Sequence, residues 1–221
     1  MSEQVETVVE QTIAAIRAAI RDGRYAQGQR LIVADVTREL GVSAGPVREA
    51  IRRLTGEGLI EIVPHKGASV RSFKSKDLRE ISQVREVIEG LAARLAAEQV
   101  AIGDNRQDLK ASIEEMRSIV RDRGNFIRHN QSFHELIYRI GGNERVRETA
   151  VQLTLPIYQL RMHNLMEADY TRVSASEHEM IAEAILDGDG AQAERMMRNH
   201  IRNSAIALLD AIGANAQRRA S

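Results

Sequence analysis

The order of apolar and polar residues predicts two helices and a short hairpin in the first third of the chain. Residues 33–40 and the segment that begins at Ala44 carry apolar side chains three and four positions apart, the spacing of one helix face. The predicted buried face of the second helix comprises Val47, Ala50, Ile51 and Leu54. Beyond it, Ile60 and Ile62 alternate with polar residues, and the run 64–67 has the composition of a turn, which predicts a hairpin.

The junction between these two helices contains residues suited to a tight turn. Gly41 follows the first helix at a position that favours the left-handed conformation. Ser43 is placed to cap the second helix by accepting a backbone N–H, and Pro46 falls in its first turn, where a missing N–H costs little. We therefore expect a helix-turn-helix followed by a hairpin wing.

From Lys76 onward, the apolar residues repeat only at helical spacing, with breaks mainly at glycines. The predicted helices cover residues 76–100, 106–122, 125–140, 143–166, 174–187 and 190–213. The expected fold is mainly α: a winged helix-turn-helix domain over residues 1–73 and an all-α helical bundle over residues 77–213.

One face of the second helix is suited to DNA. Gly45, Arg48 and Arg52 share this face; the glycine removes bulk, and arginine can bridge a guanine edge or clamp a phosphate. The predicted wing tip adds His65 and Lys66, next to a glycine. An arginine pair taken alone is usually a solvated helix face, but the order of helix, turn, helix and wing favours a DNA-binding domain.

Composition narrows the function without revealing it. Lysine plus arginine and aspartate plus glutamate number 31 each, so DNA affinity must come from local placement of charge and should depend on salt. Cysteine is absent, which excludes thiolate metal sites and disulfides, and an aromatic content of 3% disfavours base stacking on single strands. We expect no membrane span, no signal peptide and a cytoplasmic location.

Histidines on apolar helix faces are the candidate chemistry of the bundle. His134, His178 and His200 each align with the buried positions of a different predicted helix, and Asn130 lies one turn before the first of them. A single inward histidine is usually a hydrogen-bonded core residue, but three together favour a shared transition-metal site. His129 points away from Asn130 on the same helix and is expected to be solvated.

Arg85 lies among inward apolar residues of the first bundle helix. A buried arginine needs a partner, which is either a glutamate inside the bundle or the carboxylate of a bound ligand. Arg161 and Asn203 flank neighbouring inward positions and are weaker candidates for effector binding.

The blocks ELGVS, PVREAIRRL, EGLI and HKGASV resemble the winged-helix domain of GntR-family bacterial transcriptional regulators. The resemblance covers about residues 11–72. It implies that the positions touching operator DNA are Ser43, Gly45, Arg48, His65, Lys66 and Gly67. Two departures are Ala44, where the family commonly has arginine, and Ala34, where some members have a basic residue. The loss of an arginine at position 44 should weaken or shift sequence readout.

The blocks NQSFHELIYRIGGN and SEHEMIAEAILDGDGAQAERMMRNHI resemble the helical FCD ligand-binding domain of the FadR subgroup of that family. This resemblance implies that His134, His178 and His200 bind a divalent metal at the floor of an effector cavity. Asn130 replaces the usual aspartate, which weakens metal retention and favours an anionic effector as a further ligand. The leading metals are Zn and Ni, and a cavity without metal is the competing outcome.

The resemblance also implies a homodimer that binds a palindromic operator in double-stranded DNA, as a repressor or activator controlled by a small organic acid. One alternative is a histidine-ligated metalloenzyme tethered to DNA, but no inward carboxylate stands out as its general base, so we expect no enzyme. Another is an architectural DNA protein, which strong net basicity would have favoured.

Overall fold

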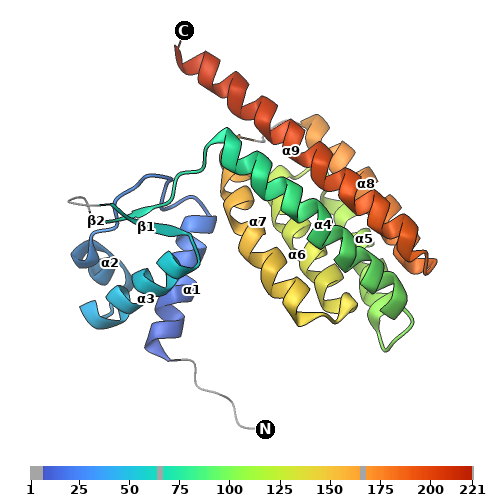
Figure 1. The fold of residues 1–221 in the computed structure, drawn as a ribbon, viewed down its shortest axis with the longest axis horizontal. Helices are drawn as coiled ribbons and strands as arrows, with labels where there is room; N and C mark the ends of the chain where they lie inside the picture. Colours follow the sequence, from blue (N-terminus) through green and yellow to red (C-terminus); the bar gives the residue numbers. More distant parts are fainter. Residues whose placement is uncertain (1–6, 64–66, 165–167, 221) are drawn as a thin grey trace. The chain divides into compact units, whose positions relative to one another are not determined.

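The computed structural model describes residues 7–63, 67–164 and 168–220 of the chain (Figure 1). Within these ranges, the side chains of the following residues are not described: 123, 155, 156, 158–164, 168, 169, 215, 216 and 218–220. The chain forms two compact units, Met1–Lys74 and Ser75–Ser221, and each is considered by itself.

The N-terminal unit has the predicted order of elements. It comprises α1 (Val8–Arg21), α2 (Val33–Leu40), α3 (Ala44–Gly56), β1 (Ile60–Val63) and β2 (Gly67–Val70). The two strands are antiparallel, with Ile60 opposite Val70 and Val63 opposite Gly67. The winged helix-turn-helix fold is therefore confirmed in the described residues.

The turn before α3 differs from expectation in one detail. Gly41 adopts the left-handed conformation with a φ of 67°, and its N–H bonds to the carbonyl of Thr37, as predicted. Ser43 has the extended backbone of a helix cap, but its exposed side chain makes no capping hydrogen bond within the described residues. The prediction of a side-chain cap was wrong, and the first N–H groups of α3 remain open to an outside acceptor.

The C-terminal unit is a helical bundle. Its elements are α4 (Ser75–Gln99), α5 (Asn105–Ile119), α6 (Arg123–Gly141), α7 (Glu144–Asn164), α8 (Ala168–Leu186) and α9 (Gly190–Ala220). The longest helices, α4 and α9, run side by side, and α4 also packs against α6, α7 and α8 (Figure 1). The all-α prediction is confirmed.

Two helices are longer than their apolar patterns indicated. α8 begins at Ala168, six residues before the predicted start, and α9 continues past Gly213 to Ala220. Gly213 has no positive φ, so it does not end the helix. The end of α9 contains several alanines, which form helix readily without an apolar stripe, and this explains why the pattern understated its length.

The inner face of α4 is built from small and charged residues. Ile81 and Ile88, the apolar neighbours of Arg85 on its helical stripe, were expected to point inward but are only half-buried, whereas Ala92, Ala93 and Ala96 are fully buried. At Gly90, an added Cβ would lie 2.8 Å from Cγ of Arg198 on α9. The glycine therefore permits α4 and α9 to approach closely, and the bulkier isoleucines lie to the side of this contact.

No helix in the described part of the chain has the length and apolar character needed to cross a membrane.

Candidate metal centre and DNA-contacting surface

Three helices of the bundle bring their histidines together. His134 on α6, His178 on α8 and His200 on α9 have exposed fractions of 2%, 0% and 1%. One ring nitrogen from each lies within 4.8 Å of the others, and the Nε2 atoms of His178 and His200 are 3.2 Å apart. The Nε2 contact has the length of a hydrogen bond, and it also matches the separation of about 3.3 Å between two nitrogens bound to one tetrahedral Zn at the usual bond length, so this pair of histidines has the spacing of two ligands of one ion.

Aromatic packing sets the orientation of the middle histidine. The ring of Phe133 stacks on His178 at 4.3 Å between centroids. The ring of Phe126 is also stacked with His178, at a centroid distance of 6.4 Å. Both phenylalanines belong to the apolar face of α6 and are fully buried. The apolar periodicity of α6 thus supplies both the core and the wall of the histidine cluster.

Carboxylates lie behind two of the histidines. Oε2 of Glu89 is 2.6 Å from Nδ1 of His134, and Oε2 of Glu177 is 2.7 Å from Nδ1 of His200. The contact between Glu177 and His200 is a hydrogen bond, so this carboxylate holds the Nδ1 proton and directs the lone pair of Nε2 to the other side of the ring. His200 is therefore oriented as metal ligands usually are, whereas the contact between Glu89 and His134 is close but lacks hydrogen-bond geometry.

Glu89 is the functional residue that the sequence pattern missed. It is fully buried, and its Oε1 accepts from Nε of Arg85 at 2.7 Å and lies 2.5 Å from Nη2. Burial opposes the charged form of this carboxyl, but Arg85 and then His134 outweigh it and hold its pKa well below the usual range. The statement that no inward carboxylate stands out was therefore wrong.

The spacing of four residues between Arg85 and Glu89 was the signal that could have found this carboxylate, because side chains four apart meet on a helix. Of the two partners considered for Arg85, the structure selects the glutamate inside the bundle. The same carboxylate, together with burial as the larger cause, raises the pKa of Tyr138 well above its usual value.

Glu177 connects His200 to a predicted effector residue. Its Oε1 accepts from Nδ2 of Asn203 at 2.7 Å while its other oxygen faces His200. Burial raises the pKa of Glu177, but the bonds from His200 and Asn203 lower it more, so the carboxylate form is favoured. Arg85 and Asn203 thus each contact a carboxylate behind a histidine. The side chain of Arg161 is among those that the structure does not describe.

Several buried polar atoms at the cluster lack a hydrogen-bond partner among the described residues, and two of them could face a cation. Oδ1 of Asn130 and Nε2 of His134 have no hydrogen-bond partner among the described residues. Asn130 lies one turn before His134 on α6 and is buried. Buried polar atoms normally find a partner, and a lone pair on each of these atoms could serve a cation. The donor set of three imidazoles and one amide fits a transition metal.

His129 is placed differently from the prediction. It is buried rather than solvated, and its Nε2 lies 3.3 Å from Oγ of Ser112 on α5. Burial lowers its pKa. The prediction failed because α6 is covered by α4, α5, α7 and α8, so more than one stripe of this helix is buried.

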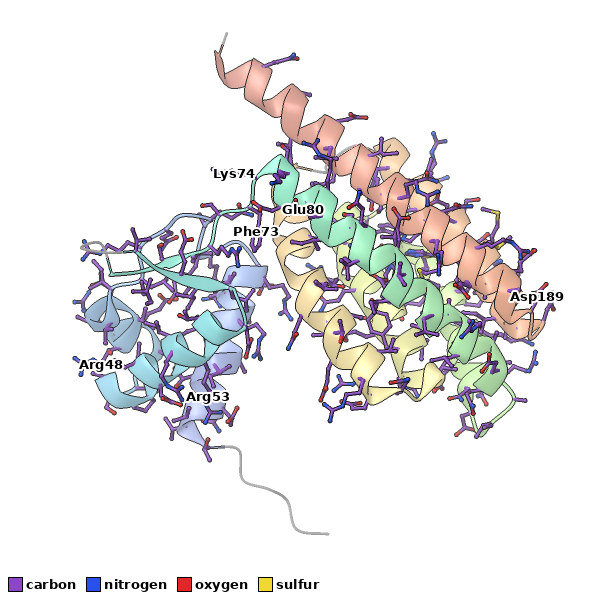
Figure 2. The ribbon with its side chains drawn as sticks, in the orientation of Figure 1. Arg48, Arg53, Phe73, Lys74, Glu80 and Asp189 are labelled. Carbon is purple, nitrogen blue, oxygen red and sulfur yellow. The ribbon has the colours of Figure 1, made fainter. Side chains whose placement is uncertain are left out.

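The DNA candidates of α3 are all exposed. Arg48 projects from α3 at the periphery of its unit and forms no ion pair with the described residues (Figure 2). An added Cβ at Gly45 would meet no atom of the described chain within 4 Å, so its own fold does not require glycine there. Arg52 is held by Glu49, with Nη2 to Oε1 at 2.6 Å.

The wing is described only in part. Gly67 opens β2 with a φ of 82°, a conformation that favours glycine, and the guanidinium of Arg30 lies near it. Ile62 on β1 is 60% exposed, in contrast to the buried Ile60 on the same strand. His65 and Lys66 lie outside the described residues.

Comparisons with known proteins agree with this architecture. The family described as bacterial regulatory proteins, gntR family, matches residues 8–70, and the FCD domain matches residues 80–203. A probable D-xylose utilization operon transcriptional repressor of Paenarthrobacter nicotinovorans is 30% identical over 198 residues, covering 88% of this chain and 86% of that protein.

Two further comparisons extend this similarity. The HTH-type transcriptional repressor RspR of Escherichia coli K12 is 26% identical, covering 89% of this chain and 86% of its own length. Among solved structures, E. coli McbR/YncC has a TM-score of 0.80 at 22% identity, covering 92% of this chain and 97% of that chain, and shows the same fold.

Proposed function

Since the chain belongs to the GntR family of bacterial transcriptional regulators and carries an FCD domain, we propose that it binds a palindromic operator as a homodimer and responds to a small organic acid bound beside a divalent transition metal. The observation that carries the ligand-responsive part is the cluster of His134, His178 and His200 with carboxylates behind two of its rings.

The surface of α3 supports the DNA-binding part. Arg48 is exposed, and Gly45 leaves room for close approach of a phosphate or base edge near the N-terminus of the helix. Arg52 can exchange its exposed contact with Glu49 for a phosphate. The proposed contacts to the operator are made by Ser43, Gly45, Arg48, Arg52, His65, Lys66 and Gly67.

The histidine cluster supports the metal. The proposed ligands are His134, His178, His200 and Asn130, with Zn or Ni favoured because neutral imidazole suits both ions. When bound, the metal supplies positive charge to an anionic effector. Glu89 is engaged by Arg85 and His134, so it is not a free general base, and this favours regulation over metalloenzyme chemistry.

Control of DNA binding requires unequal affinity of the effector for two states of the dimer. The effector changes operator affinity only by the factor with which it prefers one state, and operator DNA changes effector affinity by the same factor. Of the sequence candidates for effector binding, Arg161 remains a proposed contact, whereas Arg85 and Asn203 are bonded to Glu89 and Glu177 and would influence the effector through these carboxylates.

The DNA-binding proposal is tested by selecting operator sequences from random DNA with the full chain and measuring affinity by fluorescence anisotropy. Arg48→Ala should weaken specific binding by about 1–3 kcal/mol, the value of one good base contact. Arg145→Ala, which removes an exposed arginine of α7, is the matched control and should leave affinity unchanged. Failure to select any sequence, with or without metal and organic acids, would contradict the proposal.

The metal is tested by native mass spectrometry of the full chain, which also reports the dimer. We expect one transition-metal ion per chain, and its loss in His178→Ala. His129→Ala, a change at a buried histidine outside the cluster, should retain the metal. A dimer that takes up neither Zn nor Ni would remove the metal from the proposed function and leave the DNA-binding part intact.

A further inference from the structure

We propose that Asn130 makes metal binding conditional on an anion, so that this site binds a divalent metal and a monocarboxylate cooperatively. The inference rests on the proposed metal site and specifies its regulation: the metal alone is held weakly, and a monocarboxylate completes the site.

The proposed ligands carry no negative charge. They are three imidazoles and the amide oxygen of Asn130, which is buried and has no hydrogen-bond partner among the described residues. A divalent ion at this position therefore brings its full charge into a site whose histidines are at most 2% exposed. An uncompensated charge in such a place is strongly disfavoured.

The nearby carboxylates compensate this charge only in part. Glu89 is already paired with Arg85, so this pair adds no net charge. Glu177 adds one negative charge, which acts on the site through His200. With neutral imidazoles, the net charge of Arg85, Glu89 and Glu177 is −1. A bound divalent metal changes the net charge of the cluster to +1.

Arg85 is not available to hold an incoming anion. Its guanidinium contacts Oε1 of Glu89 at 2.5 Å and 2.7 Å, and both side chains are buried. Releasing Arg85 toward a ligand would leave the buried Glu89 without its guanidinium partner, beside only His134 and Tyr138 among the described residues. Among the described residues of this cluster, the metal is then the positive centre that an anion would meet, and one monoanion brings the cluster to neutrality.

This charge balance makes the two ligands interdependent. Without the anion, the bound metal leaves an uncompensated positive charge in a buried site. Without the metal, the anion has no cation to pair with. Linkage requires that each raises the affinity of the other by the same factor. A carboxylate at position 130 would supply the missing charge permanently and remove this dependence.

The test titrates Ni²⁺ into the metal-free full chain by isothermal calorimetry, with acetate present or replaced by perchlorate at equal ionic strength. We expect acetate to tighten Ni²⁺ binding roughly 5- to 150-fold, the usual range of coupling between two ligands. Asn130→Asp should bind Ni²⁺ tightly in perchlorate, with an acetate effect close to onefold. Asn130→Ala, which restores no charge, should bind more weakly and keep the acetate effect.

A reciprocal measurement on the unaltered chain protects the test against variants that misfold. The affinity for acetate, measured with and without Ni²⁺, should change by the same factor as the affinity for Ni²⁺. Equal Ni²⁺ affinity in acetate and perchlorate would overturn the inference while leaving the metal site standing, as would an undiminished acetate effect in folded Asn130→Asp. Absence of Ni²⁺ binding under every condition would overturn the inference together with the proposed metal. The DNA-binding part of the proposed function would still be tested separately, by the measurement of operator affinity.

Discussion

Two of the arginine–glutamate pairs in the chain have similar spacing but very different surroundings. On α4, the side chains of Arg85 and Glu89 are 2% and 0% exposed, whereas on α3 those of Arg52 and Glu49 are 72% and 33% exposed. The contacts have similar lengths, at 2.5 Å and 2.6 Å. Contact geometry therefore does not distinguish the pairs, and their difference lies in how much water each carboxylate and guanidinium retains.

Solvent exposure determines whether each pair can separate. The buried pair cannot be separated without leaving a charge in the core, so it is a fixed part of the scaffold behind His134. The exposed pair is screened and contributes little to folding, so Arg52 can leave Glu49 for a DNA phosphate at small cost. The same two residue types therefore form a fixed ion pair in the bundle and an ion pair that can separate in the winged helix.

The largest effect should follow from removing Glu89. Glu89→Ala leaves Arg85 buried and unpaired, and we expect a loss of about 3–5 kcal/mol in the free energy of unfolding. Chemical denaturation of the full chain followed by circular dichroism measures this loss. Replacing both members of the pair by apolar side chains of similar size, in the double variant Arg85→Met with Glu89→Leu, should recover most of it. A loss below about 1 kcal/mol for the single variant would mean that water reaches the pair.

A smaller effect is expected at the second carboxylate behind the cluster. Glu177→Gln keeps the size of the side chain but weakens the hold on Nδ1 of His200, and should lower metal affinity about 10- to 100-fold. Competition with a coloured chelator measures the affinity. Glu183→Gln, at another glutamate of α8, is the control. Equal affinity in both variants would show that Glu177 does not position His200.

Tyr25 in the N-terminal unit is intermediate between the two pairs. Its hydroxyl donates to Glu39 at 2.7 Å, and burial, with Glu39 adding to it, raises its pKa above the ordinary value of 10.0. A raised pKa in the folded state means that the stabilisation is present below pH 10 and is lost as the pH rises further. Tyr25→Phe should cost about 1 kcal/mol at neutral pH and make stability less dependent on pH above 10.

Thermal unfolding of the two proteins between pH 8 and pH 11 tests this expectation. The difference between them should shrink as the pH rises. A constant difference over that interval would show that the hydroxyl keeps its ordinary pKa in the folded chain.

The smallest effect is expected at the exposed pair. Glu49 is held ionised by Arg52 and Arg53, which lower its pKa to about 2, yet all three side chains remain in contact with water. Glu49→Gln should leave the unfolding temperature unchanged within error, but it should strengthen binding to operator DNA because Arg52 is released. A clear fall in unfolding temperature would show that this pair contributes to folding as the buried one does.

The sequence was sufficient for features that depend on local rules. The helices around Gly41, the buried face of α3 with Val47 and Leu54, and the convergence of the three histidines follow from periodicity and from family resemblance. Each of these features is encoded within a few neighbouring residues or along a single helix face.

Features that depend on several helices at once were not accessible in this way. The spacing from Arg85 places Glu89 on an inward face, but only the packing of α6 brings His134 beside it, and His129 looks solvated until α5 covers it. The α4 stripe was misjudged because Gly90 and nearby alanines, rather than isoleucines, face α9. Hydrophobicity alone does not indicate where small residues permit close helix packing.

The continuity of α4 has a mechanical consequence. The helix starts at Ser75, directly after the N-terminal unit ends at Lys74, and Glu89 lies fourteen residues along it. At 1.5 Å per residue, about 21 Å of unbroken helix joins the carboxylate behind His134 to the last residue of the winged helix. Because a continuous helix is stiff along its length, we expect a rotation of α4 beside His134 to reach Ser75, where the chain passes into the N-terminal unit.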